Sequence, residues 1–204
     1  TMNRPLHLAL LLGLSLAAGC QTARKTPPPA AAKPGFVRIF DGKTLNGWSG
    51  RTDLWSVRDG TISGETKPEN PIKNNTFLVW TAGTVDNFEL RLKYRILNGN
   101  SGIQYRSTLV DPEKFIVGGY QADFEAGKTY SGILYEERGR GILAQRGQRT
   151  VIREVDGKTK VDVVGKVGDS AQLQAAIRDS QWNDYTVIAN GNHLMHFING
   201  HMTV

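Results

Sequence analysis

"FELRLKYRI", residues 88–96, is the stretch of sequence that decides the fold class. Apolar residues alternate along it without interruption, and they are Phe88, Leu90, Leu92, Tyr94 and Ile96. The residues between them are all charged. A period of two is typical of a β-strand with one face in a core and the other in water. We therefore predict a strand over residues 88–96 that packs its apolar face against a second layer.

The rest of the chain repeats this theme. "RTVIREVDGKTKVDVV", residues 149–164, predicts a hairpin around a type I′ turn at Asp156-Gly157, and residues 185–204 predict a meander of three strands. One helix is indicated, over residues 169–180, with Asp169 or Ser170 as its N-cap. The fold class is therefore all-β, a sandwich of two antiparallel sheets with one short helix. Because no turn motif follows Met202-Thr203-Val204, we expect the sandwich to be truncated at its C-terminus.

The N-terminal segment differs in composition from the rest. Residues 1–19 combine Arg4 with the apolar run "LHLALLLGLSLAAG", which is typical of a signal peptide. The run closes on "LAAGC", which resembles a bacterial lipobox, so we expect Cys20, the single cysteine, to be lipidated. An ordinary cleaved signal peptide is the alternative.

Residues 20–35, rich in Pro and Ala, predict an extended tether to a domain over residues 36–204. By the same resemblance to lipoproteins, Gln21 indicates an exported protein anchored at the outer membrane or facing the periplasm.

The formal net charge of +6 comes from basic residues that are scattered among acidic ones, which argues against nucleic acid as a partner. The oligomeric state stays open.

Polar side chains alternate with apolar ones in three further strand-like stretches, residues 100–107, 118–125 and 134–138. If these strands are neighbours, one sheet face carries Gln104, Arg106, Gln121, Asp123, Glu136 and Arg138, with Tyr135 facing the core. Amides, carboxylates and guanidinium groups form directional hydrogen bonds, which suit sugar hydroxyls or a carbonyl. The pattern favours a polar binding surface, and a solvated sheet face with salt bridges is the alternative.

Other motifs indicate less. His196 and His201 could share a face across the Asn199-Gly200 turn, but no carboxylate stands at ligand spacing, so no metal site is predicted, although a divalent metal stays possible. "GRGILA", residues 139–144, imitates part of a dinucleotide motif outside any βα context. Trp80 could line a site.

Seven motifs in order carry a family resemblance: "FDGKTLNGW", "WSVRDGTISG", "FELRLKYRI", "NSGIQYRS", "GGYQADF", "SGILYEERGRG" and "WNDYTVIANGN". Together they resemble the 3-keto-disaccharide hydrolase family from about Phe36 to Val204. The resemblance implies a concanavalin A-like jelly roll, export, and an oxidised (3-keto) saccharide or glycoside as substrate. It implies no firm cofactor.

The implied chemistry assigns roles to the polar surface. A ketone at C3 of a sugar acidifies the C2 proton, so a base can remove it and the group at C1 can leave with help from an acid. We expect Glu136 as the base, Arg106 as the stabiliser of the enolate, and Asp123 as the acid or an orienting partner. The expected substrate-binding residues are Gln104, Gln121, Arg138, Tyr135, Asn100, Trp80 and His196.

Two alternatives to this mechanism stay open. A direct glycosidase would use Asp123 and Glu136 as its two carboxylates. A non-catalytic carbohydrate-binding lipoprotein domain would use the same surface without turnover.

Overall fold

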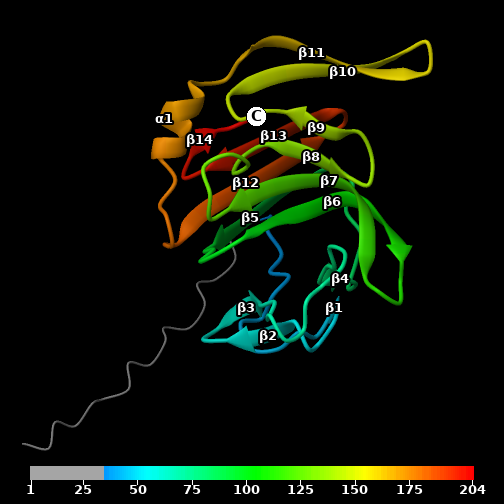
Figure 1. Ribbon diagram of the computed structural model, residues 1–204, viewed down its shortest axis with the longest axis vertical. Helices are drawn as coiled ribbons and strands as arrows, with labels where there is room; N and C mark the ends of the chain where they lie inside the picture. Colours follow the sequence, from blue (N-terminus) through cyan, green and yellow to red (C-terminus); the bar gives the residue numbers. More distant parts are fainter. Residues whose placement is uncertain (1–34) are drawn as a thin grey trace, which may run out of the picture. The chain divides into compact units, whose positions relative to one another are not determined.

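The computed structural model describes residues 35–204, and residues 37–204 form one compact unit (Figure 1). The predicted signal peptide, Cys20 and nearly all of the predicted tether lie outside the described residues. Within residues 35–204, no helix is long and apolar enough to cross a membrane.

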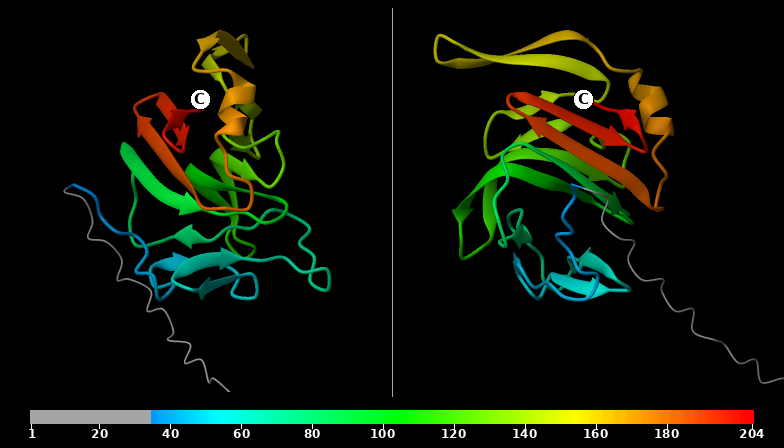
Figure 2. Two further views of the ribbon diagram at one scale, coloured as in Figure 1. Left: turned by 90° about the vertical axis from the view of Figure 1, so that its left-hand side faces the viewer. Right: turned by 180° about the vertical axis from the view of Figure 1, so that it is seen from behind.

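Two four-stranded antiparallel sheets form the body of this unit. The first has the order β14-β13-β12-β5 and consists of β5 (Phe88–Tyr94), β12 (Asn183–Asn190), β13 (His193–Ile198) and β14 (His201–Met202). The second has the order β6-β7-β8-β9 and consists of β6 (Asn100–Asp111), β7 (Ile116–Glu125), β8 (Leu134–Glu137) and β9 (Gly141–Ala144). The left view of Figure 2 shows the sheets as two layers, which confirms the predicted jelly-roll sandwich.

The remaining strands form two-stranded pairs. They are β1 (Trp48–Ser49) with β4 (Val79–Trp80), β2 (Trp55–Arg58) with β3 (Thr61–Gly64), and β10 (Gln148–Val155) with β11 (Lys158–Lys166). The hairpin of β10 and β11 projects from the sandwich next to β9 (Figures 1 and 2). Its turn residues Asp156 and Gly157 have φ values of 51° and 70°, which confirms the predicted type I′ geometry.

The hydrophobic core lies between the two large sheets. Tyr94 of β5 and Tyr185 of β12 meet Tyr105 and Ala122 from the other sheet, together with Leu134 of β8. The remaining apolar residues predicted for the strand at 88–96 pack against this cluster, so the two-residue period located the core face correctly. Leu134 lies directly opposite Ala122 in the ladder between β7 and β8, and this pairing fixes which residues of β8 face inward.

The helix is shorter than the sequence predicts. α1 covers only Ser170–Ala175, with Asp169 as its N-cap accepting hydrogen bonds from the backbone of Ala171 and Gln172. Beyond it, the Asn199 side chain donates to the carbonyl of Ala176 over 2.8 Å, and Asn183 donates to that of Arg178 over 2.9 Å. These amides satisfy carbonyls that further helical turns would otherwise occupy, so the chain turns into β12.

Candidate active site

The face of the β6–β9 sheet that points away from the core is polar. In the ladder between β6 and β7, Gln104 lies opposite Gln121 and Gly102 opposite Asp123. In the next ladder Gln121 lies opposite Tyr135. Directly opposite residues of antiparallel strands share a face, so Gln104, Gln121, Asp123 and Tyr135 lie on one surface. Asn100, opposite Glu125, begins the same surface.

A chain of hydrogen bonds crosses this surface from β6 to β7. The Ser107 hydroxyl donates to Gln104 Oε1 over 2.8 Å, and Gln104 Nε2 donates to Gln121 Oε1 over 2.6 Å. Gln121 Nε2 in turn donates to Asp123 Oδ1. Gly102 makes this arrangement possible, because a Cβ there would lie 2.6 Å from Gln121 Cγ. The amides are thus held in one orientation, which fixes the Asp123 carboxyl.

Asp123 is a buried carboxyl. It is 6% exposed, and within residues 35–204 its second oxygen, Oδ2, accepts no hydrogen bond. Burial raises the pKa of Asp123 to about 6, and the neighbouring charges of Glu125 and Glu137 add to this, although the bond from Gln121 opposes it. A carboxyl that titrates near neutral pH can both accept and release a proton.

Tyr135 and Glu137 complete the surface on β8. Burial raises the pKa of the Tyr135 phenol, and the negative charges of Glu137 and Asp123 raise it further, so this hydroxyl stays protonated at neutral pH. Glu137 is buried, and its Oε2 accepts a hydrogen bond of 3.1 Å from Asn75 Nδ2. The segment that carries Asn75 is held by Phe77, whose backbone N–H donates to the carbonyl of Phe115 over 2.9 Å.

The prediction that Glu136 belongs to this surface is wrong. Glu136 lies opposite Tyr120, on the other face of β8, because Leu134 rather than Tyr135 is the inward residue. Its carboxylate accepts two hydrogen bonds from the Arg140 guanidinium, over 2.5 and 2.9 Å, and one from the Arg140 backbone over 2.8 Å. The bond from Arg140 lowers the pKa of Glu136. Glu136 therefore closes the turn between β8 and β9.

Two of the predicted arginines also lie elsewhere. A bulge interrupts the pairing of β6 after Tyr105, and Arg106 there has a φ of 47°. Its guanidinium donates to the carbonyl of Gly191 over 2.5 Å and to that of Asp86 over 3.0 Å, so it ties two turns together. Arg138 is exposed in the turn after β8, with a φ of 54°. Both residues therefore fall outside the regular strand alternation that we used to place them on the polar surface.

The remaining candidates are dispersed. His196 is fully buried between the sheets, with Nε2 2.9 Å from the Tyr105 hydroxyl, whereas His201 is exposed, so the two do not form a metal site together. Among residues 35–204, no three His, Cys, Asp or Glu side chains gather in a way that could hold a metal ion. Trp80 lies on β4, outside both large sheets, opposite Trp48.

Sequence reasoning missed Glu137, Asn75 and the role of Glu125. The strand pattern could have identified Glu137, because it faces away from the core if Leu134 faces inward. The sequence alone does not decide this, since Tyr135 is an equally plausible inward residue. Asn75 is 62 positions from Glu137 in sequence and lies outside any regular strand, so no periodicity could associate them. Glu125 continues the alternation of Gln121 and Asp123 and could have been included.

Comparison with known proteins identifies the family. A family profile described as "3-keto-alpha-glucoside-1,2-lyase-like domain" matches residues 35–204. A protein of Bacteroides thetaiotaomicron named 3-keto-disaccharide hydrolase is 37% identical over 79 residues, a match that spans 35% of this chain but only 27% of the relative. The resemblance carried by the seven motifs is confirmed. Because the profile spans most of the sequence, the chain belongs to the family of 3-keto-alpha-glucoside-1,2-lyase-like domains.

Proposed function

We propose that this domain cleaves the glycosidic bond of 3-keto-disaccharides or related 3-keto-glycosides, and that Asp123 is the base that starts the reaction. The observation that carries the proposal is a buried carboxyl with a pKa of about 6, fixed by an amide and flanked by a protonated phenol. A surface that only bound sugars would gain little from a carboxyl whose ionised form is destabilised by burial. The family and the relative's name supply the substrate class.

The reaction follows from the ketone at C3. Asp123 Oδ2 removes the proton on C2, and the electron pair of that C–H bond forms an enolate with the C3 oxygen. The enolate then re-forms the ketone, a double bond forms between C1 and C2, and the C1–O bond breaks. The leaving oxygen takes a proton, for which the newly protonated Asp123 is the nearest source. Addition of water across the double bond completes a net hydrolysis.

The other groups of the surface act on charge and position. The Tyr135 hydroxyl donates a hydrogen bond to the C3 oxygen, where negative charge develops. Glu137 and the amides of Gln104 and Gln121 bind the sugar hydroxyls. In this proposal Arg106 and Glu136, which were expected to do the chemistry, hold turns of the fold.

Asp123→Asn tests the role of the base. We expect turnover of a 3-keto-disaccharide to fall by about 10²–10⁴, the usual contribution of a positioned general base, while binding persists. In the wild type, kcat/KM should fall as the pH drops through about 6, because the base becomes protonated. Exchange of the C2 proton with deuterated solvent, followed by NMR, isolates the first step. Exchange at the wild-type rate in Asp123→Asn would show that another group is the base.

The substrate comparison separates an enzyme from a binding domain. The wild type should turn over the keto-disaccharide and leave the unoxidised parent intact, because only the ketone acidifies C2. If both sugars were bound and neither were cleaved, the domain would be a carbohydrate-binding module.

A further inference from the structure

The loop of residues 126–133, between β7 and β8, is fixed from two sides by opposite charges. On one side the Glu125 carboxylate accepts the backbone N–H groups of Thr129 and Tyr130, over 2.5 and 2.7 Å. On the other, the Arg146 guanidinium donates to the carbonyls of Ser131 and Lys128, over 2.6 and 2.9 Å. Charge-assisted hydrogen bonds are the strong ones, so this loop is rigid for its length.

The loop stands at the end of the polar surface nearest to Asp123. Glu125, which holds it, is two residues after Asp123 and therefore on the same face of β7. The backbone N–H of Gly132 closes the loop by donating to the carbonyl of Asp123 over 2.9 Å. A residue on this loop is thus placed with respect to the carboxyl that we propose as the base.

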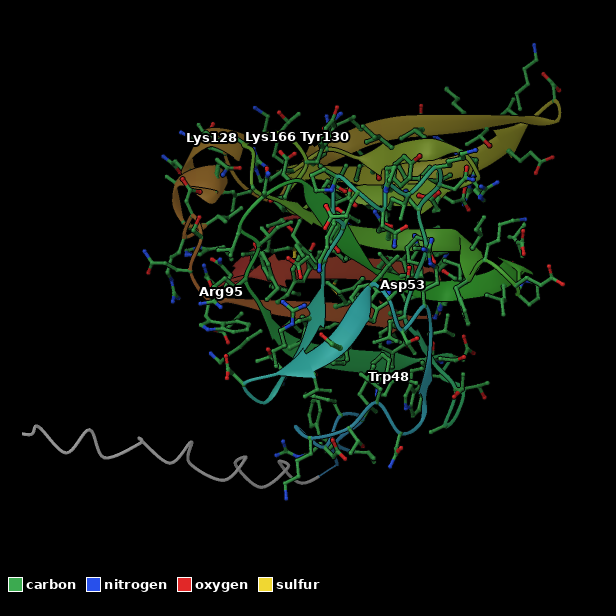
Figure 3. The ribbon with its side chains drawn as sticks, turned by 60° about the horizontal axis from the view of Figure 1, so that its bottom comes forward. Trp48, Asp53, Arg95, Lys128, Tyr130 and Lys166 are labelled. Atoms are coloured by element: carbon green, nitrogen blue, oxygen red, sulfur yellow. The ribbon has the colours of Figure 1, made fainter. Side chains whose placement is uncertain are left out.

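Tyr130 is the aromatic residue that the loop presents. It is 44% exposed, and Figure 3 marks it on the loop together with Lys128. Tyr130 is no part of the core between the sheets, although the loop's bonds hold its backbone at a defined place. An aromatic ring held in water on a rigid loop loses little conformational entropy when it takes up a ligand. The C–H face of a pyranose is an apolar surface that an aromatic ring can cover.

We propose that Tyr130 is the stacking platform for the second sugar ring of the substrate, the ring that leaves when the glycosidic bond breaks. The inference rests on the proposed function for the identity of that ring. In this proposal, contact with Tyr130 is the reason why the domain prefers a disaccharide to a simple glycoside of the same keto sugar.

The test compares a 3-keto-disaccharide with the methyl glycoside of the same 3-keto sugar. In Tyr130→Ala, kcat/KM for the disaccharide should fall on the order of tenfold, the loss of about 1.4 kcal/mol expected for one aromatic contact. The value for the methyl glycoside, which has no second ring, should stay unchanged. Tyr130→Phe keeps the ring and should behave like the wild type. Trp182→Ala, which removes an aromatic residue that is 40% exposed immediately before β12, is the matched control.

Equilibrium binding separates this inference from the proposed function. Two unoxidised ligands, the disaccharide and the methyl glycoside of its single non-leaving sugar, are titrated calorimetrically into the wild type and Tyr130→Ala. If the wild type cleaves nothing but Tyr130→Ala still weakens only the disaccharide, the proposed function fails and the platform stands. The role of Tyr130 as a platform would be contradicted by any of three results: an equal loss of affinity for both ligands in Tyr130→Ala, no loss of affinity for either, or no binding of the ligands to the wild type.

Discussion

Glu136 and Glu137 are neighbours in β8, and the pleat of the strand sends them to opposite faces of the sheet. Glu136 meets the Arg140 guanidinium, and a Cβ on Gly139 would lie 2.5 Å from its Oε2, so the turn is built around this carboxylate. Glu137 meets Asn75 and shares its surface with Asp123 and Tyr135. Two chemically identical residues thus have different tasks, one in a turn and one in the candidate site.

This pair provides a matched experiment. Glu137→Gln should lower kcat/KM for a 3-keto-disaccharide by roughly 10–100-fold, because an oriented hydrogen-bond acceptor beside the substrate is lost, about 1.5–3 kcal/mol. Glu136→Gln should leave kcat within about twofold while lowering the midpoint of thermal unfolding, since the turn loses an ion pair. Steady-state kinetics and thermal melts of both variants check this. The reverse pattern would restore Glu136 to the site.

The residue scale also shows how far the sequence could lead. Gln104, Gln121 and Asp123 lie together as expected, because Ala122 and Tyr105 are unambiguous inward residues. The sequence does not show which residues of β8 face the core, since Leu134 and Tyr135 are both apolar. Only the pairing of Leu134 with Ala122 decides between them. Arg106 was misplaced because a bulge shifts the register, and alternation alone cannot reveal a bulge.

At the scale of elements, local rules succeeded where a turn or strand is decided by its own residues. The Asp156-Gly157 hairpin and the strand at 88–96 need no distant partner to be recognised. The predicted length of the helix was wrong because its end depends on Asn183 and Asn199, which follow later in the chain and donate hydrogen bonds to the carbonyls after the helix. The loop of residues 126–133 is similar, since Arg146 reaches it from the turn after β9.

Arg146 therefore controls the stability of that loop. It is buried, and Arg146→Met would leave the carbonyls of Lys128 and Ser131 without their donor. We expect the free energy of unfolding to fall by about 1–3 kcal/mol, because the buried Ser131 carbonyl would be left without a partner. Urea denaturation measures the change, and Arg149→Met, an exposed arginine on β10, is the control. A loss below about 0.5 kcal/mol would show that water replaces the guanidinium.

At the scale of the whole molecule, we also propose from the sequence that Cys20 carries a lipid anchor. Cys20→Ser should then release the protein from the membrane fraction without changing the thermal midpoint of the domain. Membrane fractionation of bacteria that express both forms is the measurement. A Cys20→Ser protein that still requires detergent for extraction would contradict the anchor.

The β6–β9 sheet has a buried titratable group on each side. Asp123 lies on the polar surface, and His196 lies between the sheets, fully buried. Burial raises the pKa of Asp123 from 3.8 to about 6 and lowers that of His196 from 6.5 to about 3. As the pH falls from 6 to 4, folded Asp123 binds more protons than the unfolded state, which stabilises the fold. Over the same range unfolded His196 binds more protons than the folded state, which destabilises it.

These two effects have opposite signs and similar slopes, about 1.4 kcal/mol per pH unit each, so in the wild type they nearly cancel each other. Asp123→Asn removes one of them. The variant should be more stable than the wild type at pH 7 by about 1–3 kcal/mol, since a buried charge is gone, and should lose about 2–3 kcal/mol between pH 6 and 4. Asp41 and Asp53, whose hydrogen bonds lower their pKa values to about 2, contribute equally to the wild type and to Asp123→Asn, so they drop out of the comparison. Urea unfolding at several pH values measures the profiles, with the exposed Asp179→Asn as control. If Asp123→Asn and the wild type had the same profile, Asp123 would not bind its proton near pH 6 in the folded protein.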